Sequence, residues 1–157
     1  MMTRMKHVSH SPVQTQEIAS AWAKDILKHS PDVDHPSQPI VIALEGELGA
    51  GKTTFVQAFA DALGVIQNIK SPTFVLMKHY QIPNQLGYND FYHLDCYRLQ
   101  SSEDLKVLGI EDVLNSEGNI VVIEWAERVS DILPTKHWVV HIYHVAEQTR
   151  NISITQK

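Results

Sequence analysis

Residues Gly46–Thr53, with the sequence Gly-Glu-Leu-Gly-Ala-Gly-Lys-Thr, constrain the fold of this chain more than any other segment. They match the pattern G-x-x-x-x-G-K-[ST], in which backbone N–H groups curl around an anion and the lysine reaches the outer phosphates of a nucleotide. Before the motif, Ile40–Leu44 is a branched apolar run typical of a strand covered on both faces. After it, Lys52–Leu63 has apolar residues at helical spacing and is followed by Gly64. The motif therefore predicts a phosphate-binding loop between a buried strand and a helix.

The loop residues have expected roles toward a nucleoside triphosphate. The glycines let the backbone approach the phosphates, and the start of the following helix adds the positive end of its dipole. We expect Lys52 to reach the outer phosphates and Thr53 to place its hydroxyl on a Mg²⁺ ion that bridges two of them. The residues predicted to bind ATP or ADP are Gly49, Ala50, Gly51, Lys52, Thr53 and Thr54.

Glu124 is the first candidate for a second magnesium ligand. It directly follows Ile120–Ile123, an apolar run that predicts another buried strand. It should therefore emerge at the carboxyl edge of the sheet, where open α/β folds bind their ligands. Trp125, the next residue, is expected either to stack on a nucleotide or partner or to pack as core or lid.

Asp95 is a second acidic candidate, in the extended segment Tyr88–Arg98. It could orient the attacking water or hold a metal-bound water. The alternative is a structural role, in which Asp95 pairs with Arg98 or hydrogen-bonds to His93. The sequence alone leaves these roles open.

Thr73 completes the predicted catalytic set of Lys52, Asp95, Glu124 and Thr73. It lies in Ser71-Pro72-Thr73-Phe74, just after the predicted helix, where nucleotide switches often carry a threonine that senses the terminal phosphate. From the residues alone, this segment is simply a proline turn.

The remaining pattern predicts one P-loop NTPase domain over residues 11–157, preceded by a tail over residues 1–10. The fold class is α/β, with a mixed, mostly parallel central sheet flanked by helices and with antiparallel hairpin strands. Helices are expected at Gln14–His29, Ser101–Leu108 and Ile110–Asn115, the second with its serine hydroxyls as caps. Further strands are expected at Phe74–Gln81, Tyr88–Arg98, His137–Tyr143 and Asn151–Thr155.

Composition limits the partners and the compartment. The 157 residues carry a formal charge of -5, which gives free nucleic acid little electrostatic reason to bind, so a role on RNA should run through other proteins. The single cysteine, Cys96, excludes an internal disulfide, and no signal core or membrane-length apolar run is present. We expect a cytoplasmic protein without membrane contact.

Five segments together resemble the bacterial TsaE family, the ATPase of threonylcarbamoyladenosine biosynthesis in tRNA. The resemblance covers about residues 11–154, and the order and spacing of the segments are more specific than a P-loop alone. The segments are Gly46–Thr54, Ser71–Phe74, His93–Arg98, Gly109–Asp112 and Ile123–Trp125.

The resemblance implies a Mg²⁺-dependent ATPase that is weak alone and acts with the TsaB and TsaD proteins, next to the anticodon of tRNAs that read ANN codons. Lys52 and Thr53 match the family's cradle lysine and magnesium threonine, and Glu124 matches its second magnesium ligand. Asp95 matches the family's essential strand aspartate and Thr73 its switch-like threonine.

Two other functions remain open at this stage. A nucleotide-dependent adaptor would use ATP binding, without hydrolysis, to assemble a complex. A small-molecule kinase would need an acceptor pocket and usually a lid with basic residues, and no arginine-rich lid segment stands out in the sequence.

Overall fold

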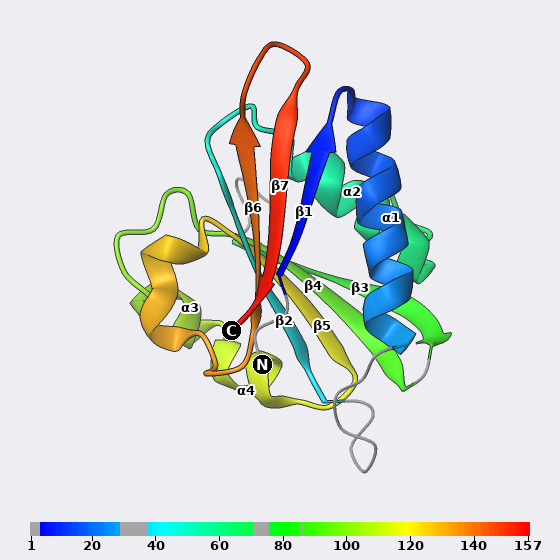
Figure 1. Ribbon diagram of the computed structural model, residues 1–157. Helices are drawn as coiled ribbons and strands as arrows, with labels where there is room; N and C mark the ends of the chain where they lie inside the picture. Colours follow the sequence, from blue (N-terminus) through cyan, green and yellow to red (C-terminus); the bar gives the residue numbers. More distant parts are fainter. Residues whose placement is uncertain (1–3, 29–37, 71–75, 86) are drawn as a thin grey trace.

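A seven-stranded sheet forms the centre of the computed structural model, which describes residues 4–28, 38–70, 76–85 and 87–157 (Figure 1). The strands are β1 (Arg4–Ser9), β2 (Ile40–Gly46), β3 (Met77–Gln85), β4 (Tyr88–Asp95), β5 (Asn119–Glu124), β6 (Trp138–His144) and β7 (Arg150–Gln156). The helices are α1 (Pro12–Lys28), α2 (Lys52–Leu63), α3 (Glu103–Val107) and α4 (Ile110–Asn115), with a 3-10 helix η1 (Ala126–Ile132). Among the described residues, no helix has the length and apolarity that crossing a lipid bilayer requires.

The strand order is β1-β7-β6-β2-β5-β4-β3. In the described sheet, three neighbouring pairs are parallel (β2 with β5, β2 with β6, β4 with β5), and three are antiparallel (β1 with β7, β6 with β7, β3 with β4). The sheet is therefore mixed, as predicted, but not mostly parallel. The antiparallel pairs come from the two hairpins and from the N-terminal strand, which adds to one edge.

The predicted N-terminal tail is wrong for Arg4–Ser9, which forms β1 and pairs antiparallel with β7. Most side chains of β1 are exposed, and the buried exception is Ser9. Backbone pairing to β7 therefore holds this edge strand more than side-chain burial does. A strand of this kind leaves almost no apolar pattern in the sequence.

Helices α1 and α2 cover one face of the sheet (Figure 1). The Trp22 ring of α1 lies 5.4 Å from the Phe59 ring of α2 and 5.5 Å from the Trp138 ring of β6, centroid to centroid. α1 starts at Pro12, earlier than predicted, because Ser11 Oγ accepts a hydrogen bond from the Gln14 N–H at 3.1 Å. α2 has its predicted bounds and ends before Gly64, which is left-handed.

The short helices α3, α4 and η1 pack on the opposite face. The expectation that serine hydroxyls cap α3 is wrong for Ser102, whose Oγ donates to Asp131 Oδ2 at 2.6 Å and makes no cap bond. The 3-10 helix η1 has no counterpart among the predicted elements. Cys96 is buried on this face, and burial, helped by nearby carboxylates, raises the pKa of its thiol to about 12. It therefore packs as a small apolar side chain.

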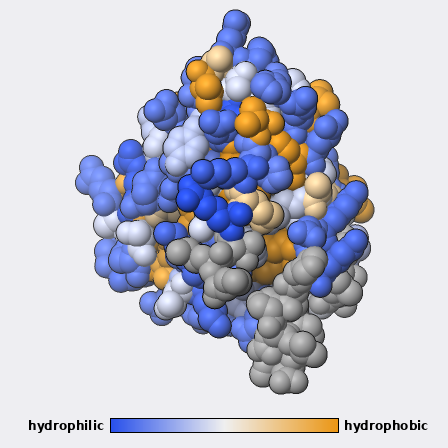
Figure 2. Space-filling view, in the orientation of Figure 1, coloured by the Kyte–Doolittle hydropathy of each residue, from blue (hydrophilic) through white to orange (hydrophobic). Residues whose placement is uncertain are grey.

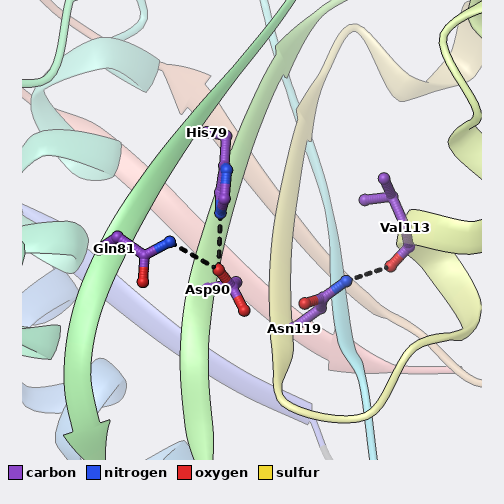
Figure 3. Close-up of polar contacts among 5 residues, drawn as sticks. All are labelled: His79, Gln81, Asp90, Val113 and Asn119. Atoms are coloured by element: carbon purple, nitrogen blue, oxygen red, sulfur yellow. Dashed lines mark hydrogen bonds and ion pairs between the residues drawn. The ribbon is translucent and has the colours of Figure 1, made fainter.

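The hairpin of β3 and β4 forms the other edge of the sheet. β3 begins at Met77 and continues to Gln85, through the stretch predicted as a loop, with a register shift after Gln81. Pro83, which has no N–H to donate, lies within this irregular stretch. Two side chains of β3 also hydrogen-bond to β4: His79 Nε2 and Gln81 Nε2 donate to Asp90 Oδ1 at 2.7 and 3.1 Å (Figure 3). The predicted start of this strand at Phe74 lies outside the described residues.

The central strands β2, β5 and β4 are parallel neighbours, so their carboxyl ends lie side by side at one end of the sheet. Leu44, Glu124 and Asp95 stand in one row across these parallel strands. The chain then turns from β2 into α2, so the helix begins next to the same row of strand ends. The fold therefore brings the glycine-rich loop and the strand-end acids to one place.

The surface of the molecule is largely polar. Hydrophilic side chains cover most of the molecular face in Figure 2.

Candidate functional site

The glycine-rich loop, residues 46–53, joins β2 to α2 and depends on backbone shapes that other residues adopt with strain. Gly51, the residue before α2, has φ 105°, and Gly49 has φ 79°. At Gly46 a Cβ atom would lie 2.7 Å from the Ile142 carbonyl oxygen. Glycine is therefore required here both by conformation and by the close approach of β6.

Lys52 and Thr53 occupy the first turn of α2. The Lys52 side chain is buried, and its ammonium donates to the Gly46 carbonyl and, at 3.4 Å, to the Glu47 carbonyl. Burial lowers the pKa of Lys52, and this effect is opposed by the nearby carboxylates of Glu124, Glu127 and Asp95. The cation is thus held inside the loop, with acidic groups facing it.

A pocket of about 430 Å³ opens between the loop and the strand ends. It brings together most of the site residues predicted from the sequence, which are Gly49, Gly51, Lys52, Thr53, Thr54, Asp95 and Glu124. Ala50 does not line it among the described residues, since its side chain is buried beneath the loop. Thr73 lies outside the described residues. Tyr97 and Arg98 also line the pocket, although no role there was predicted for them.

Glu124 ends β5 with only 3% of its surface exposed. Its Oε2 accepts a hydrogen bond of 2.6 Å from Nε2 of His93, which is fully buried. Because Nε2 carries the donated proton, Nδ1 of a neutral His93 bears a lone pair, and this atom has no hydrogen-bond partner among the described residues. His93 therefore fixes the orientation of the carboxylate. His93 therefore bonds to Glu124, and not to Asp95 as one of the predicted alternatives had it.

Asp95 ends β4 and is the register neighbour of Glu124. Its Oδ1 accepts a hydrogen bond of 3.0 Å from the backbone N–H of Tyr97, which bends the chain as it leaves the strand. Asp95 is half-buried, whereas Glu124 is buried. The two neighbouring carboxylates thus differ, one locked by a histidine and the other at the mouth of the site.

Trp125 forms the wall beside Lys52. It is the only described residue other than glycine with positive φ, at φ 58° and ψ 40°, where the chain turns from β5 into η1. The Lys52 Nζ lies 4.0 Å from the centroid of the indole ring, and the Tyr97 ring lies 5.0 Å from it. The aromatic face therefore covers the cation as well as packing against its neighbours.

The donor set around the pocket fits Mg²⁺. Thr53 supplies a hydroxyl, and Glu124 and Asp95 supply carboxylates, which are the hard oxygen ligands that Mg²⁺ prefers. Among the described residues, no group of three or more His, Cys, Asp or Glu side chains could hold a metal ion by itself. Mg²⁺ usually keeps several waters and binds through one or two carboxylates together with phosphates, and the pocket offers two carboxylates.

A family model described as "Threonylcarbamoyl adenosine biosynthesis protein TsaE" matches residues 9–152. The chain belongs to the TsaE family. Curated relatives named tRNA threonylcarbamoyladenosine biosynthesis protein TsaE include that of Haemophilus influenzae, 38% identical over 120 residues, which are 76% of this chain and 72% of the relative. The TsaE of Rickettsia bellii is 31% identical over 157 residues, which are 99% and 98% of the two chains.

A solved structure supports the fold of this TsaE-family chain. The crystal structure of Bacillus subtilus YdiB superposes with a TM-score of 0.71 at 29% sequence identity. The match covers 99% of this chain and 87% of the other. The arrangement of strands and helices described above is therefore shared along nearly the whole chain.

Proposed function

We propose that this protein binds and hydrolyses ATP, with Mg²⁺, as a component of the machinery that forms threonylcarbamoyladenosine in tRNA. The membership in the TsaE family, and relatives that are named as tRNA threonylcarbamoyladenosine biosynthesis proteins, support the pathway. The observation that carries the chemistry is that one pocket joins the glycine-rich loop to two strand-end carboxylates.

Phosphate binding would fall to the loop and the start of α2. The N–H groups at the helix start and the helix dipole favour an anion, and the Lys52 cation lies inside the loop. Phosphate oxygens would compete with the carbonyls of Gly46 and Glu47 for the Lys52 ammonium. A bound anion would also offset the burial that lowers the pKa of Lys52.

Mg²⁺ would be held by Thr53 and Glu124, and when bound it would neutralise charge on the β and γ phosphates. His93 would keep the Glu124 carboxylate in one orientation for the metal, through the 2.6 Å hydrogen bond that it donates. Buried ligands that are fixed in this way lose little freedom on binding.

Asp95 would orient the water that attacks the terminal phosphate. Hydrolysis breaks the bond between the γ phosphorus and the bridging oxygen while the water oxygen bonds to phosphorus, and ADP and phosphate are the products. Asp95 is suited to this role because it lines the pocket, is partly exposed and is held by the Tyr97 amide. Thr73 would sense the terminal phosphate from the segment that precedes β3.

The partners would be the TsaB and TsaD proteins, with tRNA reached only through them and in the cytoplasm. The formal charge of -5 gives this chain little attraction for RNA of its own. Hydrolysis would be slow without the partners, as it is in other P-loop enzymes that depend on an activating protein. We expect the energy of ATP to act on the partner complex.

The direct test is phosphate release from ATP by the full chain, with and without TsaB and TsaD. We expect clear stimulation by the partners and its loss in Lys52→Ala. Equal turnover with and without the partners would contradict the proposed dependence, and stimulated hydrolysis by Lys52→Ala would contradict the proposed site. ATP-dependent assembly without any phosphate release would favour the adaptor function instead.

A further inference from the structure

Arg150, the first residue of β7, lies against the glycine-rich loop, although 100 positions separate it from Ala50. Its Nε donates to the Ala50 carbonyl at 3.0 Å, and its Nη2 donates to the Gly49 carbonyl at 3.3 Å. Arg150 is not among the described residues that line the pocket. It therefore contacts the loop backbone without reaching the space where a phosphate would bind.

The same guanidinium also holds the turn between β6 and β7. Its Nη1 lies 2.8 Å from the Ala146 carbonyl oxygen, 3.2 Å from that of Glu147 and 3.1 Å from that of Thr149. Arginine suits such a position because it carries five N–H donors in a rigid, always charged plane. Arg150 thus connects two loops that the sequence places far apart.

The bonds from Arg150 fix the direction of the loop amides. A trans peptide is planar, so the carbonyl of one residue points opposite to the N–H of the next. Carbonyls of Gly49 and Ala50 that face Arg150 therefore turn the N–H groups of Ala50 and Gly51 away from it. The Ala50 N–H closes a turn onto the Glu47 carbonyl at 3.1 Å, and the Gly51 N–H stands at the start of α2.

The loop needs such an anchor because its backbone is intrinsically soft. Glycine visits many conformations at little cost, and Ala50 has Gly49 and Gly51 on either side. Without an external contact, the loop would lose this freedom only when it binds a ligand, and affinity would fall accordingly. Bonds from a charged donor to two successive carbonyls hold the peptides before the ligand arrives.

We propose that Arg150 is a positioning residue for phosphate binding, which keeps the Gly49–Gly51 backbone in its anion-binding shape. The proposal rests on the proposed function, since it assigns a role in the same site. A purely structural role, in which Arg150 only ties down the β6–β7 turn, is the competing account. The two accounts differ in whether nucleotide affinity changes in a protein that remains folded.

The experiment compares wild type with Arg150→Lys, Arg150→Gln and the control Arg4→Gln, which changes an exposed arginine of β1. The dissociation constants of ATP and of inorganic triphosphate are measured, with KM and kcat for ATP in the presence of TsaB and TsaD. If the binding shape drops to about a tenth of the population in Arg150→Gln, both constants rise about tenfold. We expect a smaller rise in Arg150→Lys, no rise in Arg4→Gln, and a kcat at saturating ATP within about twofold of wild type.

Amide hydrogen exchange of the same proteins without nucleotide supplies a readout that does not depend on binding. We expect faster exchange at residues 49–51 in Arg150→Gln than in Arg4→Gln, with Arg150→Lys between wild type and Arg150→Gln. Should Arg150→Gln fail to fold, Arg150→Lys still decides through both measurements. Wild-type affinity and exchange in a folded Arg150 variant, or a fall in kcat with KM unchanged, overturn the proposal. Failure of the wild type to bind either ligand overturns it together with the proposed function.

Discussion

The two walls of the pocket are built in different ways. The loop wall, residues 46–54, is contiguous and presents backbone groups, with glycines at positive φ and Arg150 behind it. The strand-end wall, residues 95, 97, 98, 124 and 125, presents side chains from the ends of two strands that meet only in the sheet. Backbone donors bind an anion of any identity, whereas placed carboxylates act on a metal and a water. We infer that the loop wall serves binding and the strand-end wall serves hydrolysis.

The largest expected effect comes from removing the cation of the loop wall. Lys52→Met keeps the length and apolar stem of the side chain but loses the charge that would meet the phosphates. We expect ATP affinity to fall by about a hundredfold or more and phosphate release by roughly a thousandfold. Isothermal titration with ATP measures the affinity, and Lys70→Met, which changes an exposed lysine, is the control. ATP affinity like that of wild type in Lys52→Met would show that the loop wall does not bind phosphate.

A smaller effect is expected at Glu124, where two substitutions separate the metal from the fold. Glu124→Gln keeps an oxygen that can accept the His93 bond but removes the charge, so half-maximal phosphate release should need about tenfold more Mg²⁺. Glu124→Ala leaves His93 Nε2 buried without its acceptor, which should cost about 1–3 kcal/mol of stability. Urea unfolding measures the second effect. If both variants were equally unstable, Glu124 would be chiefly a structural partner of His93.

The smallest expected effect is the pH dependence of stability that Lys52 contributes. Burial lowers the pKa of Lys52 in the folded protein below its usual value of 10.5. Between these two pKa values the unfolded chain binds more protons, so stability should rise with pH toward 10.5. The difference between the pH profiles of wild type and Lys52→Met in urea unfolding isolates this contribution. If the stability difference between wild type and Lys52→Met stayed constant or fell as pH rises in this window, burial would not lower the pKa of Lys52.

The two walls also differ in how far the sequence predicts them. The loop wall can be predicted from the sequence because one contiguous motif specifies the backbone shape together with the strand before it and the helix after it. The helix α2 has its predicted bounds. Glu124 and Asp95 could be placed at one edge because strand ends of a parallel sheet meet there. The predicted roles of both walls in ATP hydrolysis stay predictions.

Three of the missed features depend on long-range pairing. The bond from His93 to Glu124 follows from the register of β4 on β5, which the chain pattern does not give. The alternation along β4 does place His93 on the face of Asp95, and this was the available signal. Arg150 and the edge strand β1 left no local signal, because one acts through distant carbonyls and the other is mostly exposed.

The division between binding and hydrolysis is tested most directly with Asp95→Asn, which keeps an oxygen for the Tyr97 amide but removes the charge beside the proposed water. Single-turnover phosphate release from protein saturated with ATP, in the presence of TsaB and TsaD, is measured together with the ATP dissociation constant. We predict that the affinity stays within about threefold of wild type while phosphate release falls by roughly a hundredfold. Release at the wild-type rate, or a loss of affinity as large as that of Lys52→Met, would contradict the account.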